Sequence, residues 1–223
     1  MVYKIMVWYF ILILLSSCSG YRMSQQDNPL AQYGIKSVSL PMFFNYSNQT
    51  DASGHFTKET YRLLSTYKGL KLKNGYRPEA DAVLIGIIKS PEKISLTTQP
   101  NNLRFAQNRA ANAIGSTREK FYIPGTTDIS LYLHVILIKK PSDQELMLLQ
   151  SGIGDQIKAS SRIIFNELIP LRGQYAREVF DNSSTSDAVS VTATQNAGIQ
   201  RKVIRNLSEQ AAISIRDLIL YAF

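Results

Sequence analysis

The sequence predicts an α+β fold: a two-layer sandwich whose mostly antiparallel, mixed four-stranded sheet carries two helices on one face. Three features predict it. Residues 82–88 form an almost unbroken apolar run, residues 128–138 alternate between two faces, and the region after residue 196 repeats apolar side chains at steps of three or four. Short apolar runs and alternation indicate strands, whereas the longer step is typical of an amphipathic helix.

The first segment, residues 1–17, has the features of a secretory signal peptide. Lys4 makes its start positive, and residues 5–15 are apolar without a charged side chain. This run is too short to cross a bilayer as a helix, but it suits the apolar region of a signal peptide. The residues that follow it, Leu15-Ser16-Ser17-Cys18, resemble the lipobox of bacterial lipoproteins.

Cys18 is the only cysteine of the chain, and we interpret it as a lipid anchor. The lipobox resemblance implies that its thiol receives diacylglycerol and that the chain is cut just before it. Two or three acyl chains hold a protein stably at a membrane, whereas one does not. The alternative is an ordinary signal peptide with an incidental cysteine. Since no second cysteine is present, the fold must depend on packing and hydrogen bonds.

The polar residues 18–34 are interpreted as a tether, and the domain is expected to span residues 35–223. Residues 35–40 predict a weak strand that ends at Pro41. Asp51 or Ser53 is placed to cap a helix that runs to about Tyr67, followed by Gly69 as a left-handed residue. The side chains expected on the buried side of this helix are Phe56, Leu63, Leu64 and Tyr67.

The remaining elements complete the predicted sheet and its second helix. Residues 82–88 predict a buried strand in which Gly86 permits a bulge or a close approach of other backbone. In the strand at 128–138, Ile129 to Leu137 supply one face at every second position. Residues 145–152 are interpreted as the second arm of a hairpin. The last helix is expected to bury Ile204, Leu207, Ala211, Ile215 and Leu218.

In their order, these parts resemble the LptE family, the lipoprotein component of the outer-membrane lipopolysaccharide (LPS) translocon. The resemblance covers residues 18 to about 94, 128–152 and 188–223, and we interpret residues 95–127 and 153–187 as insertions. It implies a protein that plugs an LptD-like β-barrel and binds LPS at the periplasmic face of the outer membrane. Ser19, in place of an aspartate, favours the outer membrane by analogy with lipoprotein sorting.

Motifs for catalysis are not found in the sequence. It has two histidines, His55 and His134, too few and too far apart to indicate a metal site. Nucleophile-elbow, P-loop and dinucleotide-binding motifs are not found either. We therefore expect no enzymatic activity, no cofactor and no metal, and a hydrogen-bonded structural role for His134. The net charge of +8 favours acidic partners, but a secreted anchor argues against nucleic acid.

One basic segment is a candidate LPS-binding site. It carries Arg104, Arg109, Arg118 and Lys120, together with the rings of Phe105, Phe121 and Tyr122. Guanidinium groups suit phosphate, and nearby rings suit acyl chains. The alternative is a solvated loop. For the whole protein, the alternatives to an LPS-translocon plug are a scaffold or adaptor lipoprotein of another envelope complex and a lipid-modifying enzyme.

The anchor assignment predicts that Cys18→Ala blocks acylation, because the variant removes the only thiol that could accept diacylglycerol. The precursor should also stay uncleaved before residue 18. Metabolic labelling with palmitate measures this directly. Label that persists in the variant would show that the anchor lies elsewhere.

Overall fold

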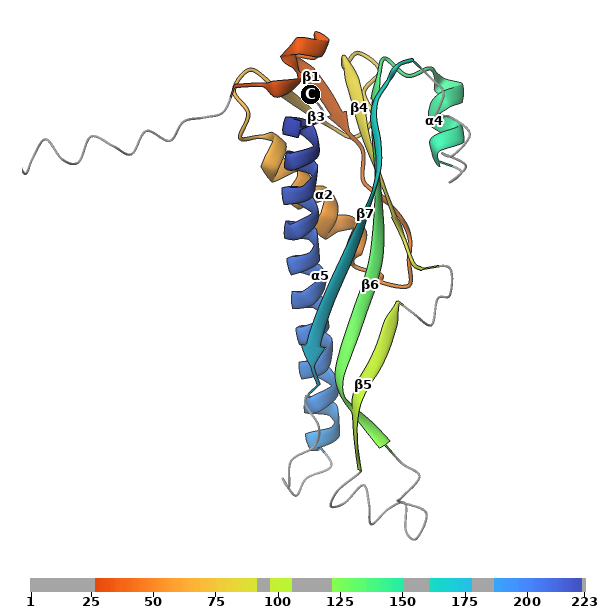
Figure 1. Cartoon of the computed structure of the whole chain (residues 1–223), viewed down its shortest axis with the longest axis vertical. Helices are drawn as coiled ribbons and strands as arrows, with labels where there is room; N and C mark the ends of the chain where they lie inside the picture. Colours follow the sequence, from red (N-terminus) through yellow and green to blue (C-terminus); the bar gives the residue numbers. More distant parts are fainter. Residues whose placement is uncertain (1–26, 92–96, 106–121, 151–160, 178–186, 222–223) are drawn as a thin grey trace, which may run out of the picture.

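The computed structural model describes residues 27–91, 97–105, 122–150, 161–177 and 187–221 (Figure 1). Cys18 and the predicted signal peptide lie outside these residues, as does most of the predicted tether. Residues 27–34, the end of that tether, pack on the domain. Leu30 is buried in the 3-10 helix η2 (Pro29–Tyr33), and the backbone of Asp27 forms an isolated parallel β-bridge with that of Lys68.

The described residues form an α+β structure with a seven-stranded mixed sheet, so the expectation of four strands was wrong. Strands β1, β3 and β4 run parallel to one another, and β2 is parallel to β4. Strand β6 is antiparallel to β4, β5 and β7. The strands are β1 (Ser37–Leu40), β2 (Phe44–Tyr46), β3 (Lys71–Asn74), β4 (Ala82–Lys89), β5 (Thr98–Phe105), β6 (Tyr122–Lys139) and β7 (Ile163–Ala176).

Three α-helices accompany the sheet within the described residues: α2 (Ala52–Leu64), α4 (Asp143–Gln150) and α5 (Asp187–Tyr221). Helices α2 and α5 contact each other, and α5 also contacts β7. Helix α4 lies on the other side of the sheet from α5 (Figure 1). No helix among the described residues is both long and apolar enough to cross a membrane.

The main core lies between one face of the sheet and the helices α2 and α5. The predicted inner face of β6 is confirmed, since Ile129, Leu131, Leu133, Val135 and Leu137 are all buried in this core. Helix α5 contributes side chains at the predicted spacing, with Leu218 half-buried and Ile219 fully buried. The apolar period of each element therefore selects the face that it buries. From α5 the core receives Val203, Ile204, Leu207, Ala211, Ile215 and Ile219.

A second, smaller apolar cluster lies on the opposite face of the sheet. It joins β4 to the end of β6, and the half-buried Phe44 and Ile163 pack against it. Strand β4 is therefore buried on both faces, which explains its apolar run without alternation. The cluster consists of Val83, Ile85, Ile87, Ile136 and Ile138.

Two parts of the sequence differ from their predicted structure. Residues 145–152 were predicted as a strand, but residues 143–150 form α4, so that prediction was wrong. A short apolar run such as Leu146 to Leu149 does not by itself distinguish a helix from a strand. The hairpin partner of β6 is β7, within the stretch interpreted as an insertion at 153–187, and β5 lies in the stretch 95–127.

Gly86 permits a close approach, as predicted, but the approaching group is a ring instead of backbone. A Cβ at Gly86 would overlap the side chain of Phe43. Helix α2 holds Phe43 in place from both sides: Ser53 Oγ donates to its carbonyl oxygen, and its N–H donates to Thr57 Oγ1 at 2.9 Å. Asp51 occupies the N-cap position without a side-chain capping bond. Gly69 has the predicted left-handed conformation, with φ of 82°.

The molecule is elongated, with two distinct ends (Figure 1). At one end lie Asp27, η2, the starts of β1, β3 and β4, and the ends of β6 and α5; we call it the anchor pole. At the other end, the far pole, lie the end of β5, the start of β6, the end of β7 and the start of α5. Helix α5 has 35 residues, so it spans about 50 Å between them.

The buried face of α5 predicts a strong effect of Leu207→Asp. Leu207 is 1% exposed in the main core, so the variant would bury an unpaired carboxylate and lower the free energy of unfolding by about 3 kcal/mol or more. Thermal or urea unfolding measures the change. Arg205→Ala is the matched control, since Arg205 is exposed on the same helix and should be nearly neutral. Equal melting temperatures for wild type and Leu207→Asp would contradict this face.

Candidate functional site

A groove with a mainly apolar lining lies between β7 and the C-terminal end of α5. Its volume is about 540 Å³. Strand β7 forms one wall and the last turns of α5 form the other, so the contact between these elements creates it. We call it the β7–α5 groove. Its lining residues are Phe165, Glu167, Leu168, Ile169, Pro170, Ser214, Asp217, Leu218 and Tyr221.

Two of its large apolar side chains are open to solvent. Leu168 is 54% exposed and Tyr221 is 81% exposed. Isolated exposed apolar residues are common on protein surfaces, but these two border the same groove. The fold does not bury them. Leu168 pairs with His134, so its side chain points to the face of the sheet away from α5, and Tyr221 is the last residue of α5. The border of the groove therefore exposes apolar area to a partner.

Strand β7 is also an edge of the sheet. Among the described residues it pairs with β6 alone, so half of its backbone groups face away from the ladder. Pro170 lies in the middle of the strand and lacks an N–H, as is typical of an edge strand. The exposed Glu167 adds a charge beside it. Proline and charge on an edge discourage uncontrolled pairing with other strands. The apolar walls of the groove, and not this edge, are thus the stronger candidate contact.

The charges around the groove are acidic or paired. Glu167 and Asp217 line it, and Asp217 accepts hydrogen bonds from Arg216 at 3.1 Å. Tyr67 is buried next to the same end of α5, and this burial raises the pKa of its hydroxyl, so it stays neutral at ordinary pH. Because Arg216 offsets Asp217, Glu167 leaves the rim weakly acidic, and such a rim does not attract phosphate. The groove therefore suits apolar protein side chains or acyl chains better than it suits an anionic headgroup.

A second hollow, of about 580 Å³, lies on the opposite face of the long strands. It is more polar than the β7–α5 groove, and apart from Pro91 its lining residues come from β5, β6 and β7. Sequence reasoning missed it because two of these strands were not predicted. Among its residues are Gln99, Asp128, Ser130, Tyr132, Arg172 and Gln174.

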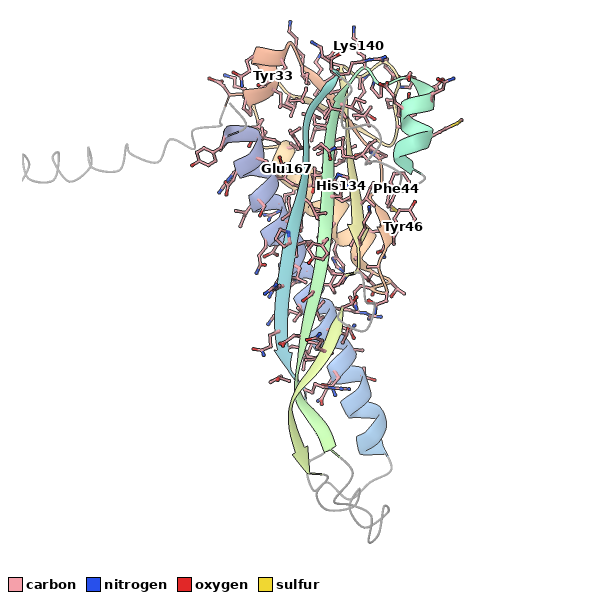
Figure 2. The ribbon with its side chains drawn as sticks, turned by 45° about the vertical axis from the view of Figure 1, so that its right-hand side comes forward. Tyr33, Phe44, Tyr46, His134, Lys140 and Glu167 are labelled. Carbon is pink, nitrogen blue, oxygen red and sulfur yellow. The ribbon has the colours of Figure 1, made fainter. Side chains whose placement is uncertain are left out.

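His134 lies in the middle of β6 and is 5% exposed (Figure 2). Its Nε2 shares a hydrogen bond with Oδ1 of Asn166 on β7, which confirms the predicted hydrogen-bonded role. Asn166 Nδ2 is buried, and no described residue accepts a hydrogen bond from it. The pair ties β6 to β7 on the face of the sheet opposite α5. Within the described part of the chain, no three His, Cys, Asp or Glu residues are grouped to hold a metal ion.

The predicted LPS-binding residues are only partly described. Arg109, Arg118 and Lys120 lie outside the described residues, as does Cys18. The backbone of Arg104 belongs to β5 and pairs with Ile123 of β6. The strands that carry both ends of this basic segment meet at the far pole (Figure 1). The segment is therefore attached far from Tyr221, which lies at the anchor pole.

No protein-family model and no curated protein matches the chain. Weakly similar solved structures include a protein described as a lipoprotein from Caulobacter crescentus, with a TM-score of 0.37 and 8% identity over 81% of this chain and 87% of that chain. Rare lipoprotein B from Shewanella oneidensis (TM-score 0.35, 11% identity) and a minor lipoprotein from Acinetobacter baumannii (0.35, 14%) each match over 81% of this chain and 90% of theirs. Such values establish neither family nor function.

Proposed function

We propose that this chain is a lipid-anchored lipoprotein at the periplasmic face of the outer membrane. It plugs and assists assembly of an LptD-like β-barrel, and it binds LPS during delivery to the outer leaflet. The lipobox at Cys18 and the order of motifs that resembles the LptE family support the proposal. The proposal assigns no catalytic step to the chain.

The observation that carries the proposal is the exposed apolar lining of the β7–α5 groove. Leu168 and Tyr221 present apolar area that the domain itself leaves open. Burial of such area is the main driving force for association between proteins. The elongated body is narrow compared with its length (Figure 2), a shape that suits insertion into the lumen of a barrel. A barrel wall that presents apolar side chains would fill the groove.

The LPS part of the proposal depends on different residues. The segment with Arg104, Arg109, Arg118 and Lys120 has the chemistry for phosphate, whereas the groove has an acidic rim. The contact with the barrel and the contact with LPS are thus assigned to separate parts of the molecule. A scaffold or adaptor lipoprotein of another envelope complex remains the alternative, since an apolar groove would serve either role.

Crosslinking from the groove tests the barrel contact. A photo-reactive amino acid at position 168, installed in cells, should form an adduct with an outer-membrane β-barrel protein, because Leu168 is exposed and borders the groove. The matched control is position 42: Met42 is 66% exposed, but it lies between β1 and β2, which β4 and β6 separate from β7. Mass spectrometry of the adduct identifies the partner.

The outcomes of this experiment separate the two functions. An adduct with a β-barrel at position 168, and none at position 42, supports the plug. An adduct with a periplasmic or inner-membrane protein supports the adaptor. Equal adducts at both positions would show that the groove is not a specific contact.

The LPS contact predicts that neutralising the basic segment weakens LPS binding. The variant replaces Arg104, Arg109, Arg118 and Lys120 with glutamine, since one exposed contact is worth little but four together are measurable. We expect at least a tenfold loss of affinity at low ionic strength, measured with purified LPS on a variant with unchanged melting temperature. Unchanged affinity in a folded variant would mean that LPS binds elsewhere or not at all.

A further inference from the structure

Four exposed lysines from separate parts of the sequence are gathered at the anchor pole. Backbone hydrogen bonds connect Lys36, Lys71 and Lys140 to one another or to Asp81, and they connect Lys68 to Asn28. Lys71 N–H donates to the carbonyl oxygen of Lys36 at 2.8 Å, and both Lys36 N–H and Lys140 N–H donate to Asp81 at 3.0 Å, to its carboxylate and its carbonyl oxygen respectively. Asn28 N–H donates to the carbonyl oxygen of Lys68 at 3.1 Å. We call Lys36, Lys68, Lys71 and Lys140 the lysine cluster.

The lysine cluster has no ion pair within the described residues. Asp81 is bound to backbone groups of the cluster, since its Oδ2 accepts the N–H groups of Lys36 at 3.0 Å and Ser37 at 2.9 Å. The hydrogen bond from Lys36 N–H, with that from the Ser37 hydroxyl, holds the pKa of Asp81 below its ordinary value, so it stays ionised and offsets one of the four charges.

The other acids at this pole have partners of their own or stand apart. Glu79 pairs with Lys73 at 3.4 Å, and Glu145 pairs with Arg162 at 3.2 Å. Asp143 accepts a hydrogen bond from the Tyr76 hydroxyl at 3.4 Å. Asp27, where the tether joins the body, carries a further negative charge. Like charges held together repel each other, and an anionic surface outside the domain would relieve this repulsion.

The attachment point of the tether indicates what that surface is. The backbone β-bridge between Asp27 and Lys68 places the end of the tether directly beside the lysine cluster. From Cys18 to Asp27 a fully extended chain reaches at most about 30 Å. If Cys18 is held in the bilayer, the anchor pole stays within a shell about 30 Å thick next to the membrane surface. Within the shell, lysines attract anionic headgroups once they approach to about 10 Å or less.

We propose that the lysine cluster docks the anchored domain onto the phosphate headgroups of the leaflet that holds its acyl chains. The anchor pole then lies at the headgroups of that leaflet. This inference rests on the proposed acylation of Cys18. Each lysine that reaches an anionic headgroup strengthens docking by roughly fivefold at low salt.

A unique tryptophan reports whether the pole touches lipid. The single tryptophan of the sequence, Trp8, is removed with the signal peptide, so Tyr76→Trp gives one fluorophore in the mature protein. Tyr76 is 38% exposed, and it contacts Asp143, just after the cluster residue Lys140. The acylated protein is reconstituted into nanodiscs of phosphatidylcholine alone or mixed with phosphatidylglycerol. Both contain lipids with a nitroxide headgroup, which quench a nearby tryptophan.

We expect Tyr76→Trp to be quenched at least severalfold more in the anionic discs than in the neutral discs, and high salt to remove the difference. Tyr175→Trp, on β7 near the far pole, should show no difference. Glutamine at Lys36, Lys68, Lys71 and Lys140 should abolish the effect. Glutamine at Lys58, Arg177, Lys202 and Arg205, which are exposed and outside the cluster, makes the same charge change and should preserve it.

Each other result overturns the inference in a distinguishable way. Equal quenching in both discs, with the acyl chains present in the mass spectrum, would reject the lysine docking and leave the anchor intact. An absence of acyl chains would reject the anchor and the docking together. Lysines that instead crosslink to carboxylates of a copurified barrel, with equal quenching in both discs, would assign the cluster to a protein partner.

Discussion

The structure depends on the pairing of strand β6, because the other long strands, β4, β5 and β7, all pair with it. One edge of β6 pairs with β4 along its second half and with β5 along its first half, and the other edge pairs with β7. Its odd-numbered residues from Ile129 to Leu137 enter the main core. A slip of one residue would move this whole set to the other face, so burial fixes the register of all three ladders at once.

The directions in which the strands run explain why the molecule has two chemically different poles. Strands β1, β3 and β4 are parallel, so their first residues meet at one end, where the antiparallel β6 finishes. The loops at this end bring lysines that are far apart in the chain beside Asp81. The tether joins at this end too. A charged surface is therefore produced there by topology, not by a basic run in the sequence.

The position of the β7–α5 groove bears on how the proposed plug would work. The groove combines apolar walls with Glu167 and Asp217, whereas the basic segment that includes Arg104 is attached at the far pole. Separation of these chemistries allows one molecule to hold a protein partner and a phosphate-bearing ligand without competition. Because α5 spans about 50 Å, a contact at one pole is also rigidly placed relative to the other.

The sequence alone determined the features that depend on local periodicity. The apolar run of β4, the alternation of β6 from Ile129 to Leu137, the presence of α2 and the buried stripe of α5 were all predicted, because burial of one face leaves a period in the chain. The predicted end of α2, near Tyr67, was wrong by about a turn, since the helix ends at Leu64. Only the tertiary structure decided the rest. Strand β7 alternates weakly, since its edge position leaves Glu167 and Leu168 exposed, and α4 is too short to show its period. The β7–α5 groove and the lysine cluster arise from residues brought together by long-range pairing, and no local pattern records which distant segments become neighbours.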